Sequence, residues 1–546
     1  MGGAVQPGKP KWACSQKPAP SRYGIWIVFL LVCALGAAYA LALDWTVQGY
    51  DDAGYILIAR SLAAGTGYRI ASDQTSWAVT TPLLPFLLAP IWFLRPQLPY
   101  DVVWFKIVPL ACALLSVPVL FSYFVRARRV PAAVALAIAA LSLLSPPTFI
   151  YAARMVMTEL PYLLLSATAL LLAHRTLVER VRSRWMWAAL GLALAATGLT
   201  RTVGLMLVAG ALAYLLWQRR WQVCLVLALL VAALLLPWQL YSRAQGDSVV
   251  APNQYQSDFL LRDYGNPELG YIESYWEIVP RLFHNAAGHL DDSLPHLFMP
   301  GLTGDRLLSL LQRSGLGWLK PAFGVGLAVI IGLGWAISWR RGVTLLEFYI
   351  PLYIGMILMP PWYASRNLVP IAPFLLYYLW VGLQAAGEWL ARWSPDLGRG
   401  ARAARVALFV AMLISILASD RHLIRQGVDA RAGRFPAWEQ NYYEAGDWLR
   451  VNAPASASVA APIPYKMALY LDRPVQNPDH VPVEPVVTGQ GLPDFIVVQP
   501  ERPLVKYEGP MGQAVAQFVR EHPERCTLVF TSRQSPYAQV YDCARR

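Results

Sequence analysis

The sequence predicts an all-α polytopic membrane protein of about eleven transmembrane helices, followed by a small C-terminal α/β domain. Of its 546 residues, 56% are hydrophobic and only 14% are charged, whereas a soluble protein carries roughly 25% charged residues. The mean hydropathy is +0.40. Long uncharged runs alternate with short arginine clusters, and after residue 420 the composition becomes that of a soluble domain. We therefore expect a membrane-embedded bundle with one domain outside the bilayer.

Apolar runs of about 20 residues define the expected spans of a transmembrane domain over residues 23–420. The first run follows a polar, basic tail of residues 1–22. Because this run is too long for the core of a signal peptide, we expect it to remain as the first span. The expected spans are 23–43, 103–125, 131–147, 158–175, 186–200, 203–217, 222–240, 318–338, 345–361, 367–385 and 405–420.

Basic clusters predict how these spans are oriented. Each cluster follows an even-numbered span, and the acidic residues lie in the other loops. The positive-inside rule therefore places the N-terminus in the cytoplasm and, after an odd number of spans, the C-terminus outside. The net charge of +13 arises from these short clusters rather than from one basic face, so we expect no nucleic-acid partner. The clusters are 126–129, 175–184, 219–220, 340–341 and 392–405.

Two outer loops follow from this topology. The loop 44–102 contains "TTPLLPFLLAPIWFL", which is too short and too rich in proline to span, so we expect it to lie in the interface or to re-enter. The region 241–317 carries clustered histidines and acids. Their spacing fits no standard metal site, so we expect a solvated loop and no cofactor, with a divalent-metal site as the alternative. These residues are His284, His289, Asp291, Asp292 and His296.

The tail 421–546 predicts a soluble extracytoplasmic α/β domain. We expect helices near 440–452 and 510–521, and short strands at "SVAA", "DFIVVQ", "TLVFTS" and "AQVYDC". Cys526 and Cys543 flank the last two strands. In an oxidising compartment a disulfide between them is expected, with two free thiols as the alternative.

The stretch "YDDAGYILIARSLAAG" places Asp51 and Asp52 where the first span ends and a helix is expected to begin. Exposed acids at such a position commonly mark the end of a span and cap the next helix. Adjacent residues on a helix point about 100° apart, so the two carboxylates are expected to have different roles. The proline-containing segment that follows makes a functional role the stronger interpretation.

This pattern resembles the GT-C superfamily of membrane glycosyltransferases, in the branch of protein O-mannosyltransferases and aminoarabinose transferases. In that family the first outer loop carries an Asp-Glu pair, then Tyr, Ala and often Arg on a juxtamembrane helix, and then a Pro-Pro-Leu-like segment. The resemblance covers roughly residues 20–380 in span order. The matching residues are Asp51, Asp52 in place of Glu, Tyr55, Ala59, Arg60 and Thr81-Pro82-Leu83.

The resemblance implies a sugar donor linked to polyprenyl phosphate. Asp51 would be the general base that deprotonates an acceptor hydroxyl, which then attacks the anomeric carbon with inversion. Because phosphate is a good leaving group, one base and a source of positive charge suffice. Asp52 departs from the family's glutamate, and we expect it to hydrogen-bond the acceptor or to hold Asp51.

The positive charge for the phosphate is expected from arginines at the outer face. Arg201 in "GLTRTVGL" and Arg366 in "PPWYASRNLVP" match basic positions of the family, and Arg60 is a further candidate. Snorkelling to lipid headgroups is the alternative for each. Tyr55 and Glu159 are expected in the substrate site, although Thr158-Glu159 also fits a simple helix cap.

The sequence thus predicts an inverting glycosyltransferase that moves a sugar to a lipid, glycan or protein hydroxyl at the outer face of the membrane. By analogy with the family, we expect the bacterial inner membrane as its location. The 21 tryptophans suit contact with membrane lipids. A transporter or flippase of lipid-linked sugars is the alternative, although such proteins place charges within their spans. A non-catalytic assembly protein is the third interpretation.

Overall fold

The computed structural model describes most of the chain. The expected N-terminal tail, apart from its last residue, lies outside the described residues, and so do residues 245–273 of the expected second outer loop. The described residues are 22–47, 50–70, 75–76, 80–179, 181, 183–244, 274–360, 363–476, 492–499, 510–535 and 537–544.

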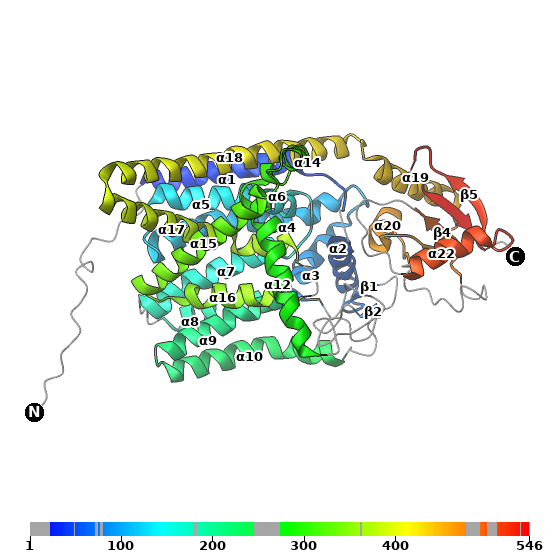
Figure 1. Cartoon of the computed structure of the whole chain (residues 1–546). Coiled ribbons are helices and arrows are strands. Elements are labelled where there is room, and N and C mark those ends of the chain that lie inside the picture. Colours follow the sequence, from blue (N-terminus) through cyan, green and yellow to red (C-terminus); the bar gives the residue numbers. More distant parts are fainter. Residues whose placement is uncertain are drawn as a thin grey trace, which may run out of the picture.

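A helix lies at each of the eleven expected spans. Most of these helices run along one common direction, and the strand-bearing C-terminal part lies beyond one end of them (Figure 1). They are α1 (Arg22–Ala42), α4 (Val102–Ser122), α5 (Ala132–Leu144), α7 (Glu159–Ala173), α8 (Arg184–Thr200), α9 (Leu205–Trp217), α10 (Trp221–Ala244), α15 (Leu319–Arg341), α16 (Leu345–Leu358), α17 (Ala372–Trp393) and α18 (Pro395–Arg431).

Seven helices of the described residues are long and apolar enough to cross a membrane. An eighth candidate is formed by α5 together with α6 (Pro146–Ala153), which are bent by 66°. Pro146 forces this break, because a proline excludes the preceding residue from the helical region, and Ser145 has an extended ψ of 137°. Since α8, α9 and α16 are shorter, the number of eleven spans stays a prediction.

Helix α18 is much longer than the expected span 405–420 and continues through the expected domain boundary at residue 420. Hydropathy detects only its apolar middle, whereas its polar ends also favour a helix. The helix ends near Gly433, which has a φ of +71° that suits glycine. One helix therefore connects the bundle directly to the C-terminal domain.

Glycines let several of the long helices approach closely. A Cβ atom on Gly334 of α15 would lie 1.9 Å from the carbonyl oxygen of Tyr378 in α17, and one on Gly382 would lie 2.3 Å from that of Ile330. Small residues at such contacts are typical of helices packed in membranes, where van der Waals contact drives association. The α15–α17 contact is therefore a tight packing seam of the bundle.

Short elements cover the end of the bundle that faces the C-terminal domain. In the first outer loop, "TTPLLPFLLAPIWFL" forms two short helices, as expected for a segment too short to span. The elements of this loop are α2 (Tyr50–Ala63), β1 (Arg69–Ile70), β2 (Thr75–Ser76), α3 (Leu83–Leu88) and the 3₁₀ helix η1 (Ala89–Leu94).

The region that the sequence suggested to be a solvated loop is helical where it is described. Its elements are η6 (Tyr275–Glu277), α12 (Ile278–Gly288), η7 (His289–Ser293), α13 (Leu294–Phe298), η8 (Pro300–Leu302) and α14 (Asp305–Arg313). In α12 the side that meets the bundle is polar, because Asn285 is buried and donates to the carbonyl oxygens of Leu358 and Pro360. Val279 and Phe283 of the same helix are exposed. Four further short helical turns are η2 (Tyr123–Ala127), η3 (His174–Val178), η4 (Thr202–Gly204) and η9 (Ser365–Ile371).

The C-terminal domain has the expected α/β structure. Four strands of its described residues form one sheet in the order β3-β4-β6-β5, with β3 parallel to β4 and the other pairs antiparallel. A disulfide joins Cys526 and Cys543, as expected. Helix α20 was not expected. The elements are α19 (Ala437–Asn452), β3 (Val459–Ala460), α20 (Pro464–Leu471), β4 (Phe495–Val498), α22 (Pro510–Glu521), β5 (Thr527–Thr531) and β6 (Gln539–Asp542).

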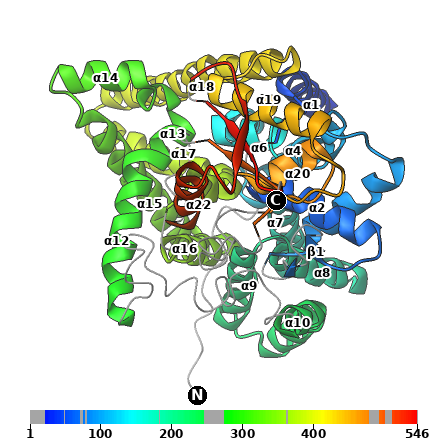
Figure 2. The same cartoon turned by 90° about the vertical axis from the view of Figure 1, so that its right-hand side faces the viewer.

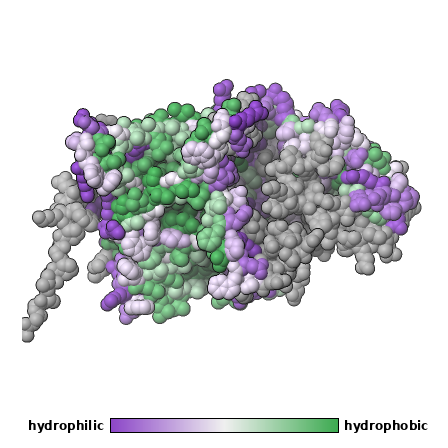
Figure 3. All heavy atoms as spheres, viewed as in Figure 1, coloured by the Kyte–Doolittle hydropathy of each residue, from purple (hydrophilic) through white to green (hydrophobic). Residues whose placement is uncertain are grey.

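Exposed apolar side chains form a band over the helical part of the molecule. In Figure 3 hydrophobic residues cover its middle, and hydrophilic residues gather at its two ends. Exposed apolar side chains such as Leu30, Leu225 and Val406 belong to this band. Viewed from the C-terminal domain, the long helices lie behind that domain and α2 lies against α20 (Figure 2). This distribution is that of an integral membrane protein with a polar domain at one end.

Candidate active site

Asp51 and Asp52 lie in the first turn of α2, where the helix dipole favours negative charge. Their side chains face different surroundings. The carboxylate of Asp51 is 38% exposed and accepts a hydrogen bond at 2.8 Å from Arg366. Asp52 is fully buried and lies within electrostatic range of Lys106 in α4. The two acids therefore lie in different surroundings, and their different roles stay a prediction.

Arg366 reaches Asp51 from η9, the short helical turn before α17. The two residues are 315 positions apart in the sequence, and the guanidinium is 33% exposed. This partial exposure leaves both charged groups accessible from outside the protein. The structure thus joins the expected base and one expected phosphate-binding arginine in one ion pair.

Glu159 and Arg201 form a second ion pair nearby. Arg201 Nη1 donates to Glu159 Oε1 at 2.5 Å and to Thr158 Oγ1 at 3.0 Å, and its Nη2 donates to Asn367 Oδ1 at 3.3 Å. Glu159 is fully buried. Thr158 makes no side-chain capping bond to α7, so the interpretation of Thr158-Glu159 as a simple helix cap is wrong. Both side chains instead hold Arg201.

The connection between α8 and α9 positions Arg201. Arg201 has extended backbone angles and interrupts the two helices. Thr81, from the motif of the first outer loop, donates to the carbonyl oxygen of Thr200 at 2.5 Å. A Cβ on Gly204 would lie 2.2 Å from the carbonyl oxygen of Thr197, so this tight turn requires glycine. The two sequence motifs therefore meet in space.

Tyr55 lies among all four charged groups. Burial raises the pKa of the Tyr55 phenol above its usual range; Asp51 and Glu159 raise it further, whereas the two arginines oppose them. The phenol therefore stays protonated and can donate a hydrogen bond at neutral pH. Tyr151 of α6, which sequence reasoning missed, lies within electrostatic range of the same four groups.

Asn367 was also missed, and it links the two ion pairs. Its side chain accepts from Arg201, and its backbone carbonyl accepts from Tyr353 Oη at 2.7 Å. Because Asn367 follows Arg366 directly, anchoring it also anchors the backbone that carries Arg366. The amide beside a candidate arginine in "SRNLVP" was the available sequence signal.

Arg60 lies apart from these residues. It is in the last turn of α2, about 13 Å along the helix axis from Asp51 at a rise of 1.5 Å per residue. Its guanidinium pairs at 2.7 Å with Asp472 of the C-terminal domain and lies 5.2 Å from the centre of the Trp92 ring. The structure therefore does not bring Arg60 to the other expected phosphate-binding residues.

A buried charge cluster holds the start of the first outer loop. Lys106 Nζ donates to Asp44 Oδ1 at 2.7 Å, and Arg154 Nε donates to Asp44 Oδ2 at 3.0 Å. Burial alone would raise the pKa of Asp44, but Lys106 and Arg154 outweigh it and hold that pKa below its usual value. The ionised cluster anchors the loop that leads into α2.

The alternative expectation was that the histidines and acids of the region 241–317 bind a metal ion. The structure shows which side chains they contact. His289 Nδ1 lies 3.0 Å from Ser293 Oγ, and His296 Nδ1 lies 3.1 Å from Thr303 Oγ1. Asp291 and Asp292 face Lys320 at 3.4 and 3.3 Å. Over the described part of the chain, no three His, Cys, Asp or Glu residues are arranged to hold a metal ion.

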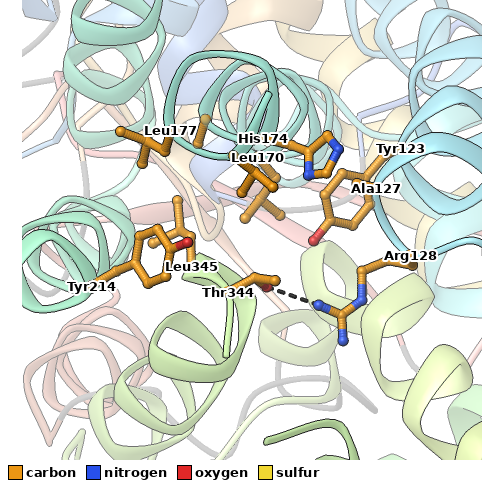
Figure 4. Close-up of a pocket in the computed structure, with 11 residues that line it drawn as sticks. Tyr123, Ala127, Arg128, Leu170, His174, Leu177, Tyr214, Thr344 and Leu345 are labelled. Atoms are coloured by element: carbon orange, nitrogen blue, oxygen red, sulfur yellow. Dashed lines mark hydrogen bonds between the residues drawn. The ribbon is translucent and has the colours of Figure 1, made fainter. Parts of the chain in front are cut away.

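A pocket lies at the opposite end of α7 from Glu159 and includes Arg128 of the first basic cluster (Figure 4). It is lined by residues of η2, α7, η3, α9 and α16, including Tyr123, His174 and Tyr214. Arg128 donates from there to Thr344 Oγ1 at 2.8 Å. None of the expected site residues lines this pocket, so it is separate from the ion pairs around Asp51.

Comparison with known proteins places this arrangement in a known fold. Neither a family model nor a curated protein sequence matches the chain. The crystal structure of ArnT from Cupriavidus metallidurans bound to undecaprenyl phosphate matches with a TM-score of 0.56 and 15% identity, over 94% of this chain and 97% of that chain. ArnT in the apo state gives a TM-score of 0.53 and 14% identity, over 95% and 98% of the two chains.

A second similar structure comes from an archaeon. The oligosaccharyltransferase AglB from Archaeoglobus fulgidus, in complex with an inhibitory peptide and a dolichol-phosphate, matches with a TM-score of 0.51 and 12% identity. The match covers 87% of this chain and 70% of that chain. These likenesses over most of the chain confirm the expected fold class: the protein is an integral membrane protein with the fold of the GT-C glycosyltransferases.

Proposed function

We propose that the protein is an inverting glycosyltransferase that moves a sugar from a polyprenyl-phosphate donor to an acceptor hydroxyl at the outer face of the membrane. The observation that carries this proposal is the convergence of Asp51, Arg366, Glu159 and Arg201 from four separate segments. The ligands in the similar structures, undecaprenyl phosphate with ArnT and dolichol-phosphate with AglB, support a lipid phosphate as the group bound here.

In this mechanism Asp51 takes the proton of the acceptor hydroxyl, whose oxygen attacks the anomeric carbon from the side opposite the phosphate. Arg366 and Arg201 hold the departing phosphate, since guanidinium groups match phosphate geometry. Tyr55 and Tyr151 lie within electrostatic range of these charges, and the protonated phenol of Tyr55 can donate a hydrogen bond there. Asp52, buried beside Lys106, holds the start of α2 so that Asp51 keeps its position.

The distribution of charge favours this function over transport. The two ion pairs lie at helix ends rather than halfway along the long helices. Asp51 is in the first turn of α2, and Arg366 lies just before α17. Glu159 begins α7, and Arg201 lies between α8 and α9. Transporters usually place such charges near the middle of the bilayer, on broken helices. A site at the membrane rim instead suits a donor whose lipid tail stays in the bilayer.

We further propose that the N-terminus is cytoplasmic and the C-terminal domain periplasmic, in a bacterial inner membrane. The arginine-rich connections, such as that between α17 and α18, lie at the end away from the C-terminal domain (Figure 1). The positive-inside rule assigns that end to the cytoplasm. The ion pairs around Asp51 then face the periplasm.

The variant Asp51→Asn tests the catalytic assignment. It removes the base but keeps the size of the side chain, so we expect the rate of sugar transfer to fall by about 10² to 10⁴. Transfer is followed as release of polyprenyl phosphate from a panel of polyprenyl-phosphate sugars, with an envelope extract as the source of acceptors.

Asp429→Asn is the matched control. Asp429 is 35% exposed and pairs with Arg434 at 2.8 Å, so its burial and ion pair resemble those of Asp51, but it lies in the last turns of α18. This variant is expected to transfer sugar at the rate of the unaltered protein. Full activity of Asp51→Asn would remove Asp51 as the base.

A further inference from the structure

Arg366 contacts the carboxylate that is proposed as the base, although the same arginine is proposed to hold the phosphate. In the described structure its Nη1 donates to Asp51 Oδ2 at 2.8 Å. Resting on the proposed function, we propose that Arg366 is a counter-ion shared by the base and the leaving phosphate. Its pairing passes from Asp51 to the phosphate during transfer.

The charges that change during transfer make such sharing useful. The acceptor oxygen bonds to the anomeric carbon, and its proton goes to Asp51. The bond between the anomeric carbon and the phosphate oxygen breaks, and its electron pair stays on the phosphate. Asp51 thus loses one negative charge while the phosphate gains one and becomes a monoester with a charge of about −2. The total charge of the site does not change.

A cation in contact with both groups stabilises this displacement of charge. The four side chains Asp51, Glu159, Arg201 and Arg366 carry two positive and two negative charges, so the site is neutral before the donor binds. Once Asp51 is protonated, Arg366 is released and matches the charge that has appeared on the phosphate. An interaction that strengthens as the reaction proceeds lowers the barrier, whereas one that is constant does not.

The contacts of the two arginines indicate which of them can exchange partners. Arg201 is held by Glu159, Thr158 and Asn367, and its side chain is only 15% exposed. Arg366 holds Asp51 through one hydrogen bond between described atoms and is 33% exposed. Arg201 is therefore a fixed positive charge, and Arg366 is the arginine that can reorient toward a ligand.

The backbone beneath Arg366 is fixed even though its side chain is accessible. The next residue, Asn367, is held by Arg201 through its side chain and by Tyr353 through its carbonyl. A reorientation of Arg366 therefore requires only side-chain rotation. Asn367 is a positioning residue in this arrangement, because it acts on the phosphate through the two arginines.

Binding of undecaprenyl phosphate to the purified protein in detergent, at constant salt, tests the exchange. Asp51→Asn imitates the protonated base in charge and releases Arg366. We therefore expect this variant to bind the lipid phosphate about tenfold more tightly than the unaltered protein, within the range of coupling between linked sites. An affinity that is unchanged or weaker would overturn the proposal.

A double-mutant cycle shows whether Arg366 carries the effect. In an Arg366→Gln background, the change Asp51→Asn is expected to raise the affinity by less than about threefold, because no guanidinium is released. An equal gain in both backgrounds would contradict the role of Arg366. Asp429→Asn, which frees Arg434 away from the site, is expected to leave the affinity unchanged.

The binding experiment separates this inference from the proposed function, because it requires no turnover. If Asp51→Asn abolishes transfer without changing the affinity, the base assignment stands and the shared counter-ion is wrong. If Asp51→Asn binds more tightly but transfers sugar normally, Asp51 and the phosphate compete for Arg366, but the base assignment and the passage of Arg366 during transfer are both wrong.

Discussion

At the scale of single residues, Asp51 and Asp52 illustrate how much a motif can indicate. Their adjacency predicted different orientations, because neighbouring helical residues point about 100° apart. The structure pairs Asp51 with Arg366 and buries Asp52 near Lys106. The spacing of the two acids was sufficient to predict that they point in different directions. Their partners Arg366 and Lys106 come from distant segments, which no local pattern specifies.

His289 allows a prediction about pH at the residue scale. Burial lowers the pKa of its imidazole to about 4, whereas the pKa of an unfolded chain's histidine is about 6.5. Between these two values the unfolded state binds a proton that the folded state excludes. Stability is therefore complete above about pH 6.5 and falls by about 1 to 3 kcal/mol as the pH is lowered toward 4.

The thermal unfolding temperature in detergent, measured from pH 7 to pH 4.5, checks this expectation. His289→Gln should reduce the dependence on pH over this range. His284→Gln is the control, because His284 in the neighbouring helix α12 is exposed. An identical slope in the His289 variant and the unaltered protein would contradict a buried, neutral imidazole.

At the scale of elements, buried charges at helix ends decide how the bundle packs. Glu347 of α16 completes a capping box with Thr344 and also pairs with Arg128 at 2.6 Å, with both side chains almost fully buried. The sequence showed Arg128 only as part of a basic cluster between two expected spans. Here it instead joins the end of α4 to the start of α16.

Glu347→Gln is expected to destabilise the bundle by about 3 to 5 kcal/mol, because Arg128 would keep a buried charge without its counter-ion. Thermal unfolding in detergent measures the loss. Glu388→Gln is the matched control, since Glu388 is 54% exposed and lies 3.8 Å from Arg341. Such exposed pairs contribute about 0 to 1 kcal/mol, so equal losses in the two variants would contradict this prediction.

Element boundaries show where sequence patterns are least informative. The break between α5 and α6 follows from the prolines at 146 and 147, which the sequence displays directly. The length of α18 cannot be read from the sequence in this way, because its polar ends carry no hydropathy signal although they are helical. Hydropathy therefore locates a helix in the membrane better than it locates the ends of that helix.

At the scale of the whole molecule, aromatic contacts join the C-terminal domain to the bundle. Trp45, between α1 and α2, packs on Tyr443 and Phe435 with ring centres 5.2 and 5.6 Å apart. Arg60 adds its ion pair with Asp472. The domain is therefore attached to the same loop and helix that carry Asp51, which keeps it next to the candidate active site.

The proposed orientation predicts which surfaces can be labelled from outside intact cells. A cysteine at Val451, which is 82% exposed in the C-terminal domain, should react with a membrane-impermeant maleimide. One at Arg399, 71% exposed at the start of α18, should react only after permeabilisation. The background carries serine at the cysteines outside the disulfide, and the reverse labelling pattern would invert the topology.

The sequence by itself determined the membrane class, the position of each long helix, the α/β character of the C-terminal domain and the candidate acids and arginines. These properties depend on hydropathy, periodicity and motifs within windows of about 20 residues. Only the tertiary structure decided that Arg366 pairs with Asp51, that Glu159 holds Arg201 and that Arg60 lies elsewhere. Pairings between distant residues depend on which helices pack together, and no short window of the chain contains that information.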